Sequence, residues 1–450
     1  MSIILGFESR SLGEGLCDLT HCLCFNLSSY INSSLPASEN GTRKQILLAL
    51  FVMMNDKFRQ LLFVSVAVSQ LSTVATADYT SNAEATFTTL QKWYDNSTGI
   101  YDTTGWWNSA NALTTLGDLA ALDSKVKSQV TSVLANSIVA AQNYNLQQTK
   151  VITPDFNQET FMGSNVPANV EVEAAINPKG FLNGYYDDEG WWALNWIQAY
   201  DITGNQDYLT TAVDIFNDMM NGTEPKCGGG IWWDKKNTYV NAIANELYLS
   251  VAAHLANRMG SQKQFYTNIA TKQWQWFQST GMINSQNTIN DGLNFTTCKN
   301  NGGTVWSYNQ GVVLGALVEL DKASPNSSYL TSAKNIATAA IKALGDSNGV
   351  LHDPCEPNCG ADGSQFKGIF MRNLQILQGA APDATYLSFI ASNANSIWTK
   401  DRDSTNELSV DWSGPFVTPA NASTQSSALD SLVAAVAYQS QIGNGIASRS

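Results

Sequence analysis

The chain has 450 residues, enough for about three average domains or for one large barrel. Its 25 Lys and Arg residues against 38 Asp and Glu residues give a formal net charge of −13, the opposite of the basic surfaces that bind nucleic acid or anionic lipid. Hydrophobic residues make up 44% of the sequence and charged residues 14%, which excludes intrinsic disorder for most of the chain.

The first 77 residues are predicted to lie outside the folded domain. After Met53, Lys57 and Arg59 precede an apolar stretch over residues 61–68 and the small-residue ending Ala-Thr-Ala at 75–77. This layout is typical of a secretory signal peptide over residues 53–77, and the apolar stretch is shorter than the about 20 residues that span a bilayer. A buried helix is the alternative. Residues 1–52 are interpreted as a non-native or disordered extension, and residues 78–450 as a single domain.

Four cysteines remain in residues 78–450. In an oxidising compartment an even number predicts two disulfides, with three possible pairings. Cys355 and Cys359 could close a tight loop and leave Cys227 with Cys298. His352 lies beside the first two, but one His and two Cys are an incomplete zinc site, so we expect no metal and no other cofactor.

Further features agree with secretion. Asn-x-Ser/Thr glycosylation motifs occur five times, at Asn96, Asn221, Asn294, Asn326 and Asn421. The C-terminus has no apolar tail of about 10 to 20 residues, so we expect no stable membrane anchor. The sequence therefore predicts a secreted, monomeric protein, located outside the cell or in the cell wall.

Helical periodicity dominates the chain from residue 78 onward. A helix rich in small or aromatic residues is followed by a more amphipathic one in five places, at residues 108–122 and 126–142, 192–203 and 208–220, 239–259 and 262–280, 308–324 and 327–344, and 366–381 and 385–401. The segments 423–439 and 78–94 supply a sixth couplet that would close a ring. The spacing, about 50 to 85 residues, is too irregular for an open solenoid. We therefore predict one all-α toroid of six helix pairs, with a cleft formed by its loops.

The strongest candidate site is the segment 181–196, FLNGYYDDEGWWALNW. Asp187, Asp188 and Glu189 adjoin one another between a Tyr pair and the pair Trp191 and Trp192. Like charges among aromatic walls should raise at least one pKa, as a general acid requires. A helix cap is the alternative interpretation. The aromatic residues favour a site, because they are costly to expose unless they stack on a ligand such as a sugar ring.

Two carboxylates on either side of a polar bond suit glycoside hydrolysis. Neighbouring residues can reach both the separation of about 5 Å that gives retention and the separation of about 6.5 to 9.5 Å that gives inversion. Serine chemistry has little support, because the Gly-x-Ser-x-Gly match at residues 345–349 follows a helix and His254 is expected to pack within one. Phosphate, zinc and dinucleotide motifs are absent from the sequence.

Other polar and aromatic residues are candidates for the cleft walls. Most of them stand at the start of predicted inner helices or follow glycines, where core packing or hydrogen bonding within the toroid is the alternative, and Lys367 could instead be a structural partner of the acids. These candidates for substrate binding are Trp107, Asn111, Trp191, Trp192, Trp233, Asn245, Asp291, Tyr308, Asn309 and Lys367. Asp291 is a candidate only through the resemblance described next.

Together these segments resemble glycoside hydrolase family 76, the endo-α-1,6-mannanases of bacteria and fungi. The resemblance covers nearly all of residues 85–440 and rests on GWWNSANAL, YYDDEGWWALNWIQAYDITGNQDYL, GGGIWW, NAIANELYL, INDGL, YNQG and FKGIFMRNL in that order. It implies an (α/α)6 barrel and retaining cleavage within α-1,6-linked mannose chains. It also implies that Asp187 is the nucleophile and Asp188 the general acid/base, and that Asn111, Asp291, Tyr308, Asn309 and Lys367 form subsites.

The resulting hypothesis is a secreted mannan endo-1,6-α-mannosidase that acts on α-1,6-mannan or on mannoprotein glycans. A cell-wall transglycosidase with the same residues is one alternative, and it would produce longer chains. A non-catalytic mannan-binding protein is another, and it would produce no new reducing ends.

Overall fold

The computed structural model describes residues 78–143, 148–152, 158–162, 180–223 and 226–447. The predicted signal peptide and the segment upstream of it lie outside these residues. No described helix is long and apolar enough to cross a membrane.

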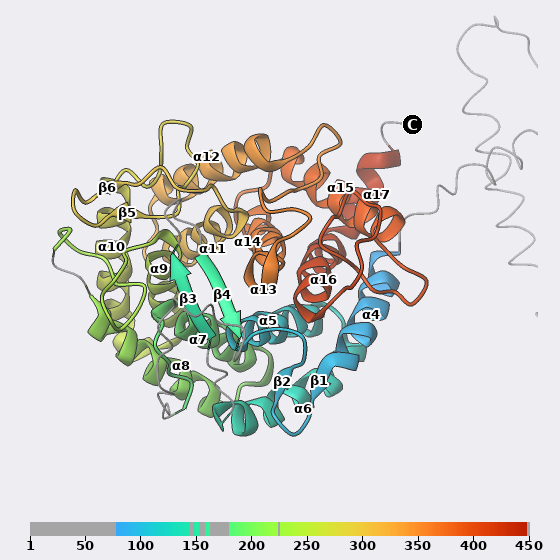
Figure 1. The fold of residues 1–450 in the computed structure, drawn as a ribbon, viewed down its shortest axis with the longest axis horizontal. Helices are drawn as coiled ribbons and strands as arrows, with labels where there is room; N and C mark the ends of the chain where they lie inside the picture. Colours follow the sequence, from blue (N-terminus) through green and yellow to red (C-terminus); the bar gives the residue numbers. More distant parts are fainter. Residues whose placement is uncertain (1–77, 144–147, 153–157, 163–179, 224–225, 448–450) are drawn as a thin grey trace, which may run out of the picture. The chain divides into compact units, whose positions relative to one another are not determined.

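Six helices form a closed inner ring (Figure 1). Each packs against the next along the chain, and the last packs against the first. They are α5 (Trp106–Leu122), α7 (Tyr186–Thr203), α9 (Ala242–Arg258), α11 (Ser307–Ala323), α14 (Phe366–Ala380) and α16 (Ala422–Ala437). Six further helices pack on the outside of this ring. They are α4 (Tyr79–Leu90), α6 (Ser124–Ala140), α8 (Gln206–Met219), α10 (Lys263–Ser279), α12 (Ser327–Leu344) and α15 (Ala384–Lys400).

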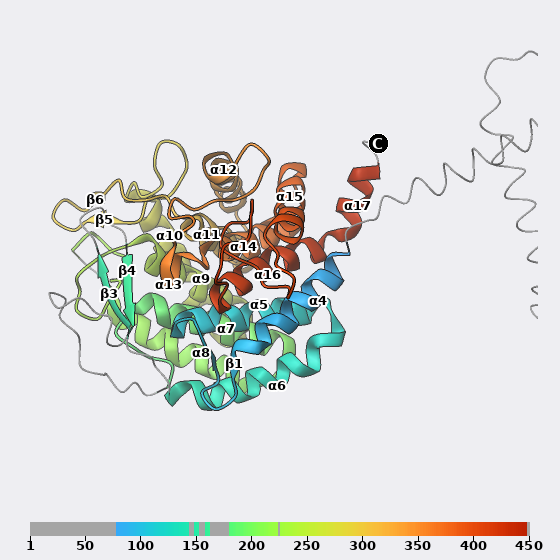
Figure 2. The same ribbon diagram turned by 45° about the vertical axis from the view of Figure 1, so that its right-hand side comes forward.

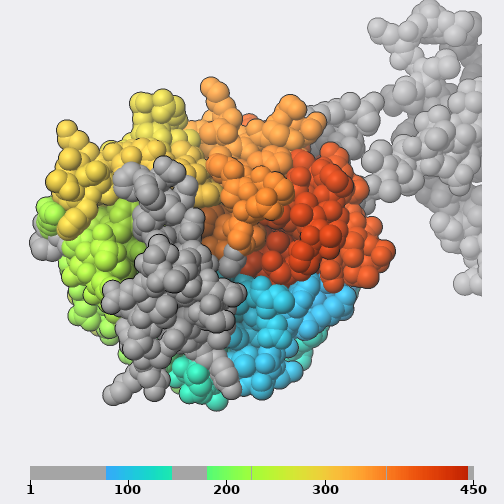
Figure 3. Space-filling view, in the orientation of Figure 1, coloured from blue at the N-terminus to red at the C-terminus, as the bar shows by residue number. Residues whose placement is uncertain are grey.

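This arrangement is an (α/α)6 barrel and confirms the predicted toroid of six helix pairs. The predicted sixth couplet joins the two ends of the domain, because α4 packs against α16. Figure 3 shows the first and last coloured segments, blue and red, meeting on one face of the molecule.

The burial of each layer follows from its sequence. On the outer helix α8 the buried residues recur every three or four positions, as Tyr208, Leu209, Ala212, Ile215, Phe216 and Met219, so one face is apolar and the other is solvated. On the inner helix α11 every residue from Ser307 to Leu320 is buried. A helix surrounded by protein on all sides must satisfy its polar side chains internally, and this requirement applies to the functional residues below.

Short strands and short helices are present in addition to the twelve helices of the barrel. Three antiparallel pairs are present, β1 (Tyr94–Asp95) with β2 (Ile100–Tyr101), β3 (Gln148–Ile152) with β4 (Gln158–Met162), and β5 (Leu293–Asn294) with β6 (Lys299–Asn300). The helices α13 (Gly360–Gly363) and α17 (Gln439–Ala447) are also short. Strand β4 contacts α13, which directly precedes α14, so this hairpin lies near the end of the ring where α14 begins (Figure 2).

Two disulfides hold loops at this same end. Cys227 bonds to Cys298, with Cα atoms 5.4 Å apart, and Cys355 bonds to Cys359, with Cα atoms 4.8 Å apart. The loops that they constrain precede α9, α11 and α14. Of the three pairings that the sequence allowed, the structure contains the one with the tight Cys355–Cys359 loop.

Candidate active site

The three adjacent acids lie in the first turn of the inner helix α7. Helix α7 begins at Tyr186 and its N-cap residue is Tyr185, so none of the acids is the cap. Their side chains are almost completely enclosed, with exposed fractions of 4% for Asp187, 1% for Asp188 and 0% for Glu189. The positive end of the helix dipole partly compensates three buried carboxyl groups at this position.

Asp187 is held by the loop that precedes α9. The indole Nε1 of Trp233 donates a hydrogen bond to Asp187 Oδ2 at 3.1 Å. The backbone of Trp233 is itself fixed, because its N–H donates to Tyr239 O at 2.8 Å and its carbonyl accepts from Tyr186 N at 2.9 Å. A donor fixed in this way holds the Asp187 carboxyl group in one orientation. Trp233, predicted from its glycine-rich context, therefore lies in the site.

The turn before α7 binds the other two acids through a single residue. Asn183 Nδ2 donates to Asp188 Oδ2 at 2.7 Å, and Asn183 N donates to Glu189 Oε1 at 2.9 Å. Glu189 also forms an ion pair with Lys235 Nζ at 2.7 Å, although burial raises the pKa of Glu189. The ion pair with Lys235 indicates a structural role for Glu189.

A fourth acid, Asp291, approaches Asp187 from the loop between α10 and α11. Asp291 is 4% exposed, and its Oδ2 accepts a hydrogen bond from Tyr239 Oη at 2.7 Å. Burial raises the pKa of Asp291 to about 7, the Tyr239 hydrogen bond opposes this shift, and the negative charge of Asp187 adds to it. The pKa of Tyr308 is raised by burial and then by the charges of Asp291 and Asp187. These residues, from α7, α11 and the loop before α11, therefore meet at one place.

Aromatic side chains line the same end of the ring. The rings of Trp107 and Trp191 stack with centroids 5.7 Å apart, and Trp107 Nε1 donates to Asp362 Oδ1 at 2.8 Å. Tyr308 stacks on Phe366 with centroids 3.7 Å apart. The structure thus groups three of the predicted wall residues, Trp107, Trp191 and Tyr308, near the start of the inner helices.

Trp192 lies elsewhere. Its ring packs against Trp106 at 5.3 Å and Trp196 at 5.5 Å between centroids, and it has no exposed surface. These contacts are those of a core residue between α5 and α7. Neighbouring side chains on a helix point in different directions, and here Trp191 faces Trp107 whereas Trp192 faces Trp106 and Trp196.

The side-chain amides of two predicted site residues, Asn245 and Asn111, are hydrogen-bonded to other parts of the barrel. Asn245 Oδ1 accepts from Ile231 N at 2.8 Å, and Asn245 Nδ2 donates to Ile231 O at 3.0 Å and to Asn241 O at 2.7 Å. Asn111 Oδ1 accepts from Arg372 Nη2 at 2.5 Å. Both amides therefore fix backbone or a neighbouring helix. Asn309 is wholly buried on α11, next to Tyr308.

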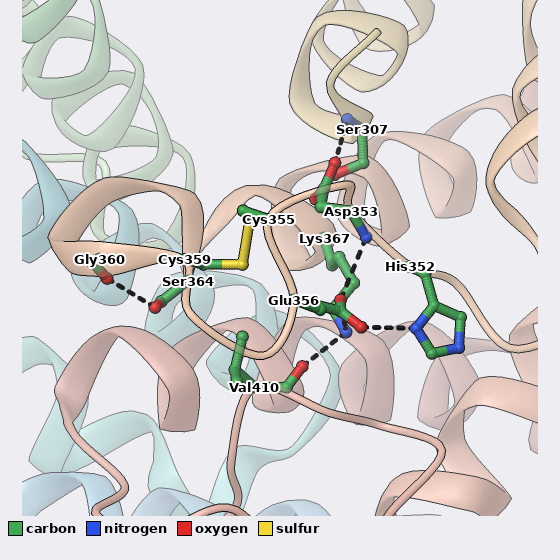
Figure 4. The surroundings of a disulfide bond; sticks show 10 residues. All are labelled: Ser307, His352, Asp353, Cys355, Glu356, Cys359, Gly360, Ser364, Lys367 and Val410. Atoms are coloured by element: carbon green, nitrogen blue, oxygen red, sulfur yellow. Dashed lines mark hydrogen bonds and ion pairs between the residues drawn. A yellow bond between two sulfur atoms is a disulfide. The ribbon is translucent and has the colours of Figure 1, made fainter. Parts of the chain in front are cut away.

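Lys367 also has fixed partners, in the network beside the Cys355–Cys359 disulfide (Figure 4). Its Nζ lies 2.5 Å from Glu356 Oε1, donates to Val410 O at 2.7 Å, and is 2% exposed. The second carboxylate oxygen of Glu356 lies 2.5 Å from His352 Nδ1. This cation therefore holds the disulfide loop against α14.

One group among the described residues has the spacing of a metal site. Ligand atoms of His352, Glu356 and Asp411 lie within 4.8 Å of one another. The ammonium group of Lys367 forms an ion pair with Glu356, so a metal cation in this group would face a positive charge at short range.

Sequence reasoning missed two residues that shape the site. Asn183 binds two of the three acids, and Tyr239 binds Asp291. Asn183 stands only four residues before Asp187, so a search for donors in the turn before the helix would have found it. Tyr239 acts across 52 residues of sequence and carries no local signal.

An (α/α)6 barrel with neighbouring carboxyl groups and tryptophans where its inner helices begin has the architecture of a glycosidase. The sequence profile of Glycosyl hydrolase family 76 matches residues 72–444, and the chain belongs to this family.

Curated relatives are fungal. The chain is 27% identical over 214 residues to the mannan endo-1,6-alpha-mannosidase DFG5 of Saccharomyces cerevisiae, covering 44% of this chain and 46% of that protein. It is also 27% identical over 216 residues to the mannan endo-1,6-alpha-mannosidase DCW1 of Candida albicans, covering 44% and 47%. The chain thus spans about half the length of the curated relatives that it matches.

Solved structures share the fold over most of the chain. One is an inactive variant of the α-1,6-mannanase GH76A of a Salegentibacter species, with Asp-to-Asn changes at two consecutive positions, in complex with α-1,6-mannotriose. Its TM-score is 0.65 at 20% identity, and the match covers 80% of this chain and 99% of that one. Another is Dfg5 from Chaetomium thermophilum in complex with glucosamine, with a TM-score of 0.64 at 18% identity and coverage of 82% and 90%. The predicted family and fold are confirmed.

Proposed function

We propose that this protein is a glycoside hydrolase that cleaves within α-1,6-linked mannose chains of mannan or mannoprotein. The observation that carries this proposal is the pair Asp187 and Asp188, buried side by side in the first turn of α7, where Trp233 donates a hydrogen bond to the first and Asn183 to the second. The solved α-1,6-mannanase that binds mannotriose was made inactive by changes to two consecutive Asp residues, which supports the same pair here.

The proposed reaction is a double displacement. A carboxylate oxygen of Asp187 attacks the anomeric carbon of a mannose unit, the bond from that carbon to O6 of the next unit breaks, and Asp188 gives its proton to the departing oxygen. Asp188 then takes a proton from water, the water oxygen bonds to the anomeric carbon, and the ester to Asp187 breaks. The Trp233 indole stabilises the Asp187 carboxylate before attack and after release.

The surrounding residues divide into two proposed groups. Trp107 and Trp191 would offer aromatic surfaces to sugar rings, and Asp291, Tyr308 and Asn309 would bind hydroxyl groups. Asn111, Trp192, Asn245 and Lys367 were predicted to bind substrate, but their contacts support a role in holding the scaffold.

Secretion is part of the proposal. Two disulfides within the described residues are typical of an oxidising compartment. Of the five glycosylation motifs, those at Asn96, Asn221 and Asn326 have exposed Asn residues. These features support the signal peptide over residues 53–77 and passage through a secretory pathway.

The test is incubation with linear α-1,6-mannan, followed by sizing of the products and by NMR of the anomeric protons. We expect shorter chains whose new reducing ends start as the α-anomer. Asp187→Asn should lower kcat by about a thousandfold or more, because it removes the nucleophile. The matched control is Asp207→Asn, which changes an exposed acid in the first turn of α8 and should leave kcat unchanged.

Three outcomes would contradict parts of this proposal. Products longer than the starting chain would mean transfer to a sugar acceptor in place of water. Binding of mannan without new reducing ends would mean a non-catalytic protein. A folded Asp187→Asn variant with full activity would remove Asp187 from the reaction.

A further inference from the structure

A pocket away from the candidate active site is lined by the segment that follows α8, by the glycines before α9, and by residues of α9 and α10. Figure 1 shows where these helices lie in the ring. The volume of the pocket is about 540 Å³, within the range of small-molecule pockets. None of the residues proposed above for catalysis or substrate binding lines it. The lining residues are Thr223, Gly228, Gly229, Gly230, Tyr248, Ile269, Lys272, Gln273 and Trp276.

We propose that this pocket is a second saccharide-binding site, which we call the α8–α10 pocket. The proposal rests on the proposed function only for the identity of the sugar, mannose. The pocket itself is argued from its aromatic wall, its two buried polar groups and its lack of a buried charge.

The aromatic wall is Trp276. Its Nε1 donates to Cys227 O at 3.0 Å, and Cys227 is held by the disulfide to Cys298. The glycine loop passes directly over the indole, since a Cβ atom on Gly230 would lie 2.3 Å from Trp276 Cη2. The ring therefore has one fixed orientation, and a ligand that contacts its exposed part does not have to immobilise a mobile side chain.

The first polar group is the Tyr248 hydroxyl. The ring of Tyr248 stacks on Phe216 with centroids 5.0 Å apart and is 5% exposed. Its hydroxyl makes no hydrogen bond to the residues that the structure describes, and burial raises its pKa to about 12, so it remains a donor. Tyr248 lines the pocket, so this hydroxyl is available to a ligand there.

The second polar group is the Gln273 side chain, also 5% exposed. Its Nε2 donates to Asn245 Oδ1 at 2.9 Å, which fixes the amide and leaves Oε1 as an acceptor beside the pocket. The lining thus combines a flat apolar face with a neutral donor and a neutral acceptor, and its one charged residue, Lys272, is exposed at the rim. A pyranose ring offers the matching surface, an apolar face bordered by hydroxyl groups.

Two sources of saccharide can reach the pocket. Thr223 is both a lining residue and the third position of the glycosylation motif Asn221-Gly222-Thr223, whose Asn221 is exposed. The sugar is therefore either part of a glycan on Asn221 or part of a separate mannan chain. Both have the same chemistry, and they are distinguished by experiment.

The experiment follows the indole N–H signals of Trp233 and Trp276 by NMR while α-1,6-mannotriose is added to the Asp187→Asn variant. Trp233 reports on the active site and Trp276 on the α8–α10 pocket. We expect both signals to shift, with separate dissociation constants. Tyr248→Phe should weaken binding at Trp276 about three- to tenfold and leave Trp233 unchanged. Tyr266→Phe is the matched control, because Tyr266 contacts the same Phe216 but does not line the pocket.

Each outcome decides the proposal. If only Trp233 responds, and Trp276 has the same signal with and without the glycan, the pocket is wrong and the proposed function stands. If only Trp276 responds, the pocket stands and the proposed active site fails. Ile269→Trp, which fills the pocket from a half-buried position, should abolish the Trp276 response even if Tyr248→Phe does not fold.

Asn221→Gln separates the two sources in protein from a glycosylating host. If the Asn221 glycan is the occupant, this variant alone has a shifted Trp276 signal before sugar is added, and it alone binds mannotriose there. If wild-type and Asn221→Gln proteins bind mannotriose equally at Trp276, the occupant is a separate chain.

Discussion

At the scale of single residues, the position of Asp291 depends on Tyr239. The Tyr239 hydroxyl donates to Asp291 Oδ2 at 2.7 Å and accepts from Asn301 Nδ2 at 2.7 Å. Gly292 leaves room for this phenol, because a Cβ atom there would lie 2.4 Å from the Tyr239 oxygen. Close packing and two hydrogen bonds therefore fix the Tyr239 hydroxyl. This hydroxyl in turn holds the carboxyl group of Asp291, whose pKa is raised further by the charge of Asp187.

Replacing Tyr239 with Phe should move the pH dependence of activity. The Tyr239 hydrogen bond lowers the pKa of Asp291 against the effect of burial, so its loss should raise that pKa above the present value of about 7. If ionised Asp291 accepts a hydrogen bond from a sugar hydroxyl, the acidic limb of kcat/KM against pH should shift to higher pH. We expect about a tenfold loss at pH 6 and a smaller loss at pH 8.

The matched control for this change is Tyr266→Phe, which also removes the hydroxyl of a buried tyrosine but lies on the outer helix α10. It should leave the pH profile unchanged. A Tyr239→Phe enzyme that loses activity equally at every pH would show that Tyr239 only supports the fold.

At the scale of elements, the inner helices are held together by close backbone contact. A Cβ atom on Gly311 of α11 would lie 2.6 Å from the Cα of Phe370 on α14, and one on Gly368 of α14 would lie 2.5 Å from the Cα of Ser427 on α16. In both cases the neighbouring atom is backbone and cannot rotate away. Glycine at these positions sets the distance between adjacent inner helices and therefore the width of the ring.

Gly311→Ala should destabilise the protein although alanine is the better helix former. The added methyl group must push α14 away, at a cost of about 1 to 3 kcal/mol, and the gain in helix propensity of about 1 kcal/mol offsets only part of it. Thermal unfolding should show a Tm lower by several degrees. Gly260→Ala is the control, because a Cβ atom there meets nothing within 4 Å. Equal Tm values for the two variants would mean that the ring expands at no cost.

The sequence predicts helices well, because their periodicity is local. It predicts side-chain contacts poorly where the two partners are distant in the sequence. Five of the six inner helices are predicted because an amphipathic outer helix such as α8 follows each of them, and the sixth, α16, because α4 at the start of the domain supplies its partner. The strands of β1 and β2 are two residues long and show no alternation that could be read. Asn111 and Lys367 were predicted to form subsites from the resemblance to family 76. In the structure Asn111 accepts a hydrogen bond from Arg372, 261 residues later, and Lys367 donates one to Val410, and neither partner could be identified from the local sequence.

At the scale of the whole molecule, several buried acids affect the pH dependence of stability. Burial raises the pKa of Asp118 to about 7, against the attraction of Arg372, and raises the pKa of Asp401 to about 7 and that of Asp430 to about 6. Between the ordinary pKa of Asp and these values, the native state holds more protons than the unfolded state. Stability must therefore fall as the pH rises through this interval.

Two other ionisable groups, Glu319 and His254, reduce the stability of the fold at acidic pH. The pKa of Glu319 is lowered by neighbouring cations including Arg258, although burial opposes this, so its stabilising contribution is lost as the pH falls through the acidic range. Burial lowers the pKa of His254, so protonation of His254 below its ordinary pKa also destabilises the fold. Stability should therefore be greatest at a mildly acidic pH, between the region where Glu319 loses its charge and the region where the buried Asp residues gain theirs.

We accordingly expect the Tm to be higher at pH 5 than at pH 8, and calorimetry at constant ionic strength can measure the difference. Asp118→Asn should reduce it, because an amide at this position has no proton to lose while it can still contact Gln198, which donates to Asp118 Oδ1 at 2.5 Å. Asp207→Asn changes an exposed acid and should leave the difference intact. A Tm that rises steadily from pH 5 to pH 8 would contradict this expectation. It would mean that the native state binds fewer protons than the unfolded chain, so that the buried acids are ionised in the native barrel and stabilised by partners stronger than those described.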